Sequence, residues 1–178
     1  MKKNLILACL LAAPLVAFNQ HAENYSSSTH STSKSHAGAK NKTQDFVNEA
    51  AKGGMQEVKM GEIGKKAHSP RVRSFAAMMV RDHSKANKEL KSIAAKNNIH
   101  IATPKTDMAV HNFENKSGPA FDKDYMDMMV EDHKKDIKLF EEQSQNGTNA
   151  EIKSFASRTL PTLKMHLDSA EAIHSSLK

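Results

Sequence analysis

Apolar residues recur at intervals of three and four over four stretches of the chain. This spacing predicts amphipathic helices at about residues 44–67, 69–97, 119–146 and 149–177. The connections between them are short, long and short. Short connections make the first two helices, and the last two, antiparallel neighbours, and one long central connection over 99–118 is typical of ferritin-like bundles. The pattern therefore predicts an all-α, ferritin-like four-helix bundle, although a simple up-down-up-down bundle with a decorated loop stays open.

Signals at the helix ends agree with these limits. Ser69 followed by Pro70 predicts a helix start, because proline is well suited to the first helical position. Thr148-Asn149-Ala150-Glu151 resembles a capping box in which the threonine and the glutamate each bind a free backbone N–H group. Pro161 lies inside the last helix and predicts a kink.

The first helix contains an unusual number of glycines, at positions 53, 54, 61 and 64. Glycine weakens a helix, so we expect compensation from close approach of a neighbouring backbone.

The N-terminal region predicts an exported protein. Two lysines precede an apolar run over 5–18 that is too short to span a bilayer, as in a signal peptide at 1–22 with cleavage after Ala17 or Ala22. A lipoprotein signal ending at Cys9 is the alternative. Residues 23–42 are rich in Ser, His and Lys and predict a disordered linker, so the bundle domain would occupy 43–178. We expect a periplasmic location or association with the outer membrane.

Charge and cysteine content narrow the classes of function. Of the formal charge of +6, two charges lie in the leader and a net two in the linker, which leaves the bundle near +2. A surface for nucleic acid needs a basic stripe and is therefore not expected. Cys9 is the only cysteine and would leave with the leader, so the mature chain would have no internal disulfide and no membrane span.

Three histidines occupy positions in the apolar stripes of three different helices. His83, His133 and His166 lie near the middle of their helices, and Glu57 has the matching place on the first helix. Buried polar groups of this kind must either bind a cation or form a closed hydrogen-bonded network. Imidazole and carboxylate ligands suit zinc, copper, iron or manganese, so a site for one transition-metal ion is predicted beside the alternative of a polar network.

Residues beside the histidines have two interpretations each. Asp82 and Asp132 are about 100° around the helix from the site, where they would either support the ligands or lie on the solvated flank; nearby lysines favour the flank. Met79 and Met129 lie one turn before two of the histidines and would suit copper(I), but filling of the core is the favoured interpretation.

The segments 78–83 and 128–133 differ at one position, which indicates a pseudo-repeat of helix pairs.

Several segments resemble a known bacterial family, namely 46–58, Ser74-Phe75-Ala76, 79–83 and 160–167. The family is domain of unknown function 4142, described as ferritin-like and often labelled an outer-membrane or secreted protein. The resemblance covers nearly all of 43–178 and implies no established reaction. Its matching positions are the residues already selected: Glu57, Asp82, His83, Asp132, His133 and His166.

The chain departs from the ferritin class where an iron pair would bind. Such a centre needs Glu-x-x-His on two helices, whereas Val80, Val130 and Leu163 stand three residues before the histidines. Motifs for nucleophilic or nucleotide chemistry are also missing from the sequence. Three functions follow: an envelope protein binding one metal ion, a structural or stress-related envelope protein that binds another protein, and a mononuclear redox enzyme. A non-enzyme is favoured.

Overall fold

A computed structural model describes residues 32–103, 113 and 116–177, and it consists of four long helices over these residues. They are α1 (Thr32–Gly64), α2 (Pro70–Lys96), α4 (Gly118–Asn146) and α5 (Ala150–His174). Each is amphipathic, which allows one stripe to face the interior while the opposite face meets water. The predicted leader, including Ala17 and Cys9, lies outside the described residues.

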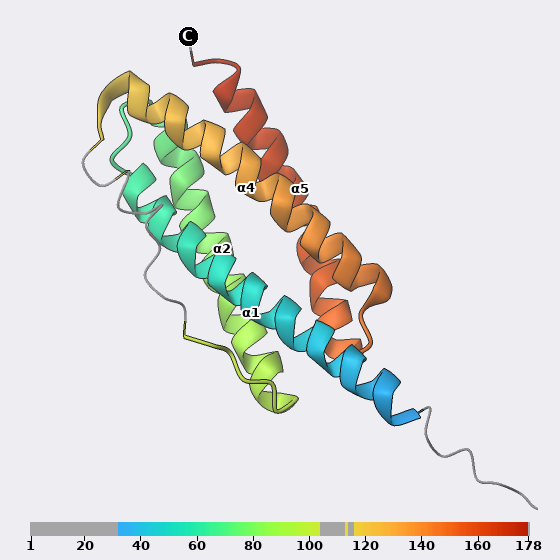
Figure 1. The fold of residues 1–178 in the computed structure, drawn as a ribbon. Coiled ribbons are helices and arrows are strands. Elements are labelled where there is room, and N and C mark those ends of the chain that lie inside the picture. The colour runs from blue at the N-terminus through green and yellow to red at the C-terminus, as the bar shows by residue number, and fades with distance from the viewer. Residues whose placement is uncertain (1–31, 104–112, 114–115, 178) are drawn as a thin grey trace, which may run out of the picture.

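The four helices form two antiparallel hairpins that pack side by side (Figure 1). The hairpin α1–α2 turns at 65–69 and the hairpin α4–α5 at 147–149. Contacts between hairpins join α1 to α4 and α2 to α5. Lys96 of α2 binds Glu151 at the start of α5, whereas Arg71 binds Ser176 at its end, so α2 and α5 are antiparallel.

The connection between the hairpins joins opposite ends of the bundle. α2 ends beside the start of α5, and α4 begins beside the other end of the molecule, where Asp122 accepts hydrogen bonds from the backbone N–H groups of His68 and Ser69. At the start of the crossover, Gln44 donates to the His100 carbonyl and Ala102 donates to Asn48, which holds this segment against α1. The ferritin-like arrangement with short, long and short connections is therefore confirmed.

Two helix ends differ from the prediction. α1 begins at Thr32 rather than near Gln44, so more than half of the predicted linker is helical. Alanine and lysine there extend a helix at little cost once the packed part has formed. At the start of α5 the cap is Asn149, whose side chain accepts from the N–H groups of Glu151 and Ile152, and Glu151 binds Lys96 instead of closing a capping box.

The interior consists of two apolar cores at different heights. One core includes Phe75, Met79 and Met129, and the other includes Leu90, Ile137 and Phe155. Met79 and Met129 are fully buried in the first core, in agreement with the interpretation as core filling. The positions of Glu57 and the three stripe histidines fall between the two cores, so a polar layer separates them.

Three of the four glycines of α1 allow close contacts, as expected. A Cβ atom on Gly61 would lie 2.9 Å from the Ala76 carbonyl oxygen, which is the predicted approach of a neighbouring backbone. At Gly54 and Gly64 the space is taken by side chains instead, those of Asn87 and Tyr125. α5 continues through Pro161 as one helix. Among the described helices, none combines the length and apolar character needed to span a membrane.

Candidate metal centre

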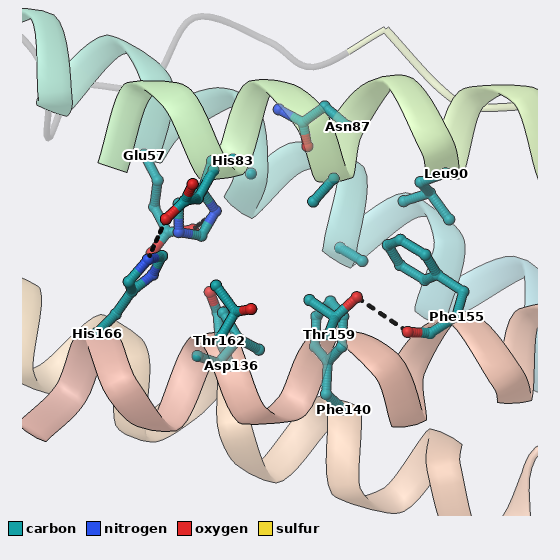
Figure 2. Close-up of a pocket in the computed structure, with 15 residues that line it drawn as sticks. Glu57, His83, Asn87, Leu90, Asp136, Phe140, Phe155, Thr159, Thr162 and His166 are labelled. Carbon is teal, nitrogen blue, oxygen red and sulfur yellow. Dashed lines mark hydrogen bonds and ion pairs between the residues drawn. The ribbon is translucent and has the colours of Figure 1, made fainter. Parts of the chain in front are cut away.

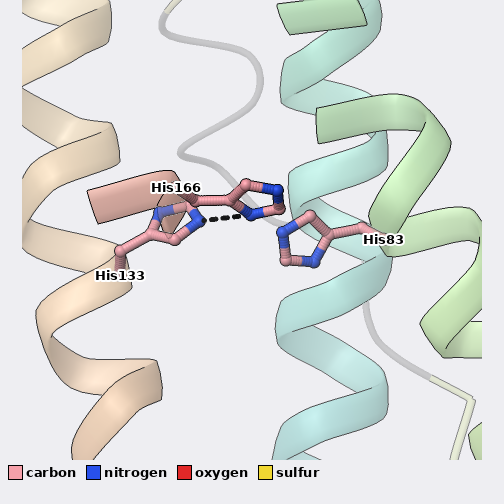
Figure 3. Close-up of side chains that lie close together, drawn as sticks. All are labelled: His83, His133 and His166. Atoms are coloured by element: carbon pink, nitrogen blue, oxygen red, sulfur yellow. Dashed lines mark hydrogen bonds between the residues drawn. The ribbon is translucent and has the colours of Figure 1, made fainter. Parts of the chain in front are cut away.

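Four buried side chains, one from each helix, meet in the polar layer. Glu57 comes from α1, His83 from α2, His133 from α4 and His166 from α5, and each is at most 6% exposed. Figure 3 shows the three imidazole rings turned toward one another, and one nitrogen from each lies within 4.8 Å of the other two. The sequence placed these four residues at one level, and the structure brings them together.

Glu57 contacts two of the three histidines. Its Oε2 atom lies 2.8 Å from His83 Nδ1, and its Oε1 atom lies 3.5 Å from His133 Nε2. The carboxylate therefore borders the group of three imidazole nitrogens on the α1 side. The other ring nitrogen of His83, Nε2, is buried and has no hydrogen-bond partner among the described residues.

The hydrogen bonds of His133 and His166 fix which nitrogens hold protons. His133 Nδ1 lies 2.8 Å from the Met129 carbonyl oxygen, which can only accept, so Nδ1 holds the proton and Nε2 is left with a lone pair. His166 Nε2 donates to Asp82 Oδ2 at 3.1 Å, which leaves the lone pair on Nδ1. These two free nitrogens face each other at 3.4 Å. In the neutral rings, two acceptors therefore meet with no proton between them.

Burial keeps the histidines in this neutral form. Loss of water around the ring lowers the pKa of His83 to about 4 and also lowers the pKa values of His133 and His166. For His133 the neighbouring Glu57 carboxylate opposes this effect, and for His166 the hydrogen bond to Asp82 opposes it. Neutral imidazole is the form that binds metal ions.

The two flanking aspartates have different surroundings. Asp82 is half-buried and joins the exposed Arg81 to His166, so it supports a site residue and the favoured solvated interpretation is wrong for this position. Arg81 and His166 also lower the pKa of Asp82 against the effect of burial, which keeps it ionised. Asp132 is partly exposed and pairs with Lys135 at 3.3 Å, so it does not support the histidines in the structure, as the favoured interpretation held.

Asp136 is a site residue that the sequence reasoning missed. It lies on α4, three residues after His133 and therefore on the same side of the helix. Its carboxyl group interacts with Glu57, and burial and this neighbour raise its pKa. Burial likewise raises the pKa of Glu57, so the two carboxyl groups hold a proton between them that an exposed pair would release. The position of Asp136, three residues after His133, was the feature of the sequence that could have identified it as a site residue.

Comparison with solved structures places the fold among small helical bundles. The crystal structure of a DUF305 fragment from Deinococcus radiodurans is similar with a TM-score of 0.69 at 11% identity, over 76% of this chain and 97% of that one. CopM in the Cu(I)-bound form is similar with a TM-score of 0.64 at 14% identity, over 75% of this chain and 96% of that one. Identities this low show a shared fold alone.

Sequence comparison identifies the family. No curated protein matches the chain. The family described as domain of unknown function (DUF4142) matches residues 28–173, which include all four helices of the bundle apart from the last residue of α5 and every residue of the polar layer. This chain therefore belongs to the DUF4142 family.

Proposed function

We propose that this chain is an exported bundle protein that binds one transition-metal ion through His83, His133, His166 and Glu57. The observation that carries the proposal is the pair of facing acceptors, His133 Nε2 and His166 Nδ1, at 3.4 Å. Two lone pairs at this distance repel each other in a buried setting unless a cation lies between or beside them. The unpaired nitrogen of His83 and the Glu57 carboxylate add to the same excess of acceptors.

The donor set favours copper or zinc. Three imidazoles and one carboxylate provide mixed nitrogen and oxygen ligands, whereas manganese prefers sites dominated by oxygen. Divalent copper and zinc also bind such ligands more tightly than divalent iron or manganese does. The copper-bound state of CopM, a protein of similar fold, supports including copper. Asp82 would orient His166 by accepting its second ring proton, as carboxylates do beside metal-bound histidines.

Metal titration of the purified mature protein tests the proposal. We expect one equivalent of copper or zinc to bind, as measured by calorimetry and by elemental analysis after dialysis. His133→Ala removes the histidine that contacts both Glu57 and His166, and we expect it to weaken binding more than about 100-fold, because loss of an outer partner alone costs up to that factor. His100→Ala is the matched control, since His100 is exposed and far along the chain from the site residues.

The alternative of a structural protein makes a different prediction for the same samples. If the polar layer is a closed hydrogen-bonded network, a chelator leaves the melting temperature unchanged and any bound metal is substoichiometric. That result, together with equal metal content in His133→Ala and the wild type, would overturn the proposed metal site. Circular dichroism of each variant checks that the bundle has formed.

The proposal of export is supported by the sequence of residues 1–22. A basic start, a short apolar run and small residues at its end are the features of a secretory leader. We expect the mature protein in the periplasmic or outer-membrane fraction with a new N-terminus after Ala17 or Ala22. N-terminal sequencing of protein recovered from fractionated cells measures this. Recovery of the uncut chain from the cytoplasm would contradict it.

A further inference from the structure

A small cavity lies directly beside the polar layer. Glu57, His83 and His166 form one end of its lining, and Asp136 and Asn87 lie farther along it (Figure 2). The cavity volume is about 30 Å³. A water molecule requires about 10–15 Å³ by this measure, so the space holds about two waters. Larger ligands do not fit.

Polar groups from three helices line this cavity. Asp136 belongs to α4, Asn87 to α2 and Thr162 to α5. Gly54 of α1 makes room for the Asn87 side chain, with which a Cβ atom there would collide, whereas a Cβ atom at Gly53 would make only ordinary contact with Asp136 Oδ1 at 3.6 Å. A cavity with this many polar groups is expected to hold water rather than to stay empty.

Asp136 has no cationic side chain of its own. Among the described residues, no lysine or arginine forms an ion pair with it, and its charged neighbours are Glu57, His83 and Asp132. Asp136 also lies outside the close group of three imidazole nitrogens. The Asp136 carboxyl group is therefore next to the proposed metal ion without being one of its ligands. It is positioned to form a hydrogen bond with a molecule that the metal ion also binds.

The proposed metal site is the basis of this inference. We propose that the cavity provides an exchangeable coordination position, in which a water molecule binds the metal ion and forms a hydrogen bond with Asp136. The position takes a small uncharged oxygen ligand, because its volume excludes anything much larger and the carboxyl groups of Glu57 and Asp136 repel anions. The site would then resemble catalytic metal sites, which keep an open position, rather than closed structural ones.

Copper(II)-loaded protein in oxygen-17-enriched water provides the test. Electron paramagnetic resonance detects hyperfine coupling from an oxygen bound to the copper. We expect this coupling in the wild type and in Asp136→Asn, which keeps a hydrogen-bonding group of the same size. We expect its loss in Asp136→Leu and in Thr162→Ile, which reduce or fill the cavity from two different helices, while the copper stoichiometry stays at one. Asp124→Leu, at an exposed position on the same helix that is outside the cavity lining, is the control.

The outcomes separate the two proposals. Wild-type protein that binds no copper would overturn the proposed metal site itself. Wild-type protein that binds one copper without oxygen-17 coupling, or with coupling that persists in both cavity-filling variants, would overturn the exchangeable position and leave the metal site intact. A variant that fails to fold is identified by circular dichroism, and the variant on the other helix then decides.

Discussion

At the scale of single residues, Asp136 and Glu57 carry an energetic cost in the metal-free protein. Two carboxyl groups that interact inside a bundle cannot both ionise cheaply, because burial and mutual repulsion oppose the charged forms. The histidines beside them oppose protonation for the same reason of burial. A cation would relieve both constraints at once, since it attracts the carboxylates and needs neutral imidazoles.

The pH dependence of stability should reveal this cost. The pKa of Asp136 is raised to about 8, so the folded chain retains a proton that the unfolded chain releases above about pH 4, and stability falls as the pH rises toward 8. The histidines, whose pKa values are lowered, contribute the opposite slope, but only below their ordinary value of 6.5. Between pH 6.5 and 8, metal-free wild type should therefore lose roughly 1 kcal/mol of unfolding free energy.

Asp136→Asn should lose most of this slope, because the amide does not titrate and Glu57 is freed from a like charge. Urea unfolding with a chelator at the two pH values measures it. Asp124→Asn, at an exposed and lysine-paired position on the same helix, should keep the wild-type slope. Equal slopes in wild type and Asp136→Asn would contradict the explanation.

The four residues of the polar layer could be predicted from sequence because each occupies a position that periodicity marks as internal. A histidine or glutamate flanked by apolar residues at three and four is conspicuous. Asp136 and Asp82 lie at the edges of their stripes, where periodicity favours solvent. Their roles depend on the orientation of neighbouring helices, which the spacing of one helix does not contain.

At the scale of elements, α1 combines weak helix formers with tight packing. Gly61 contacts the backbone of α2, whereas Gly53 has ordinary van der Waals space beside Asp136. The two positions therefore separate the intrinsic cost of glycine in a helix from its benefit in packing.

Alanine at these two positions should have opposite effects. Gly53→Ala should stabilise the protein by about 0.5–1 kcal/mol, since alanine is the better helix former. Gly61→Ala should destabilise it by about 1–3 kcal/mol, because the new methyl group would meet the Ala76 carbonyl oxygen at 2.9 Å. Urea midpoints of the two variants measure the difference. A stabilised Gly61→Ala protein would show that the helices are not so closely packed.

At the scale of the whole molecule, the topology could be predicted from the lengths of the connections. Details that depend on how the hairpins pack could not. Short, long and short connections were enough to predict two antiparallel hairpins. The extra turns at the start of α1 were not predicted, because their composition lacks an apolar stripe and local propensity alone decides there. The Asp122 contact to the α1–α2 turn also depends on how the hairpins meet.

The polar layer contains two residues from each hairpin, with Glu57 and His83 on one and His133 and His166 on the other. Half a site on each hairpin means that neither can assemble the full set before the two have docked. A chain that crosses a membrane unfolded would thus carry no finished site during transit, and its ion would be taken from the compartment in which it folds. The identity and amount of bound metal would then indicate in which compartment the protein folded, as well as whether it folded at all.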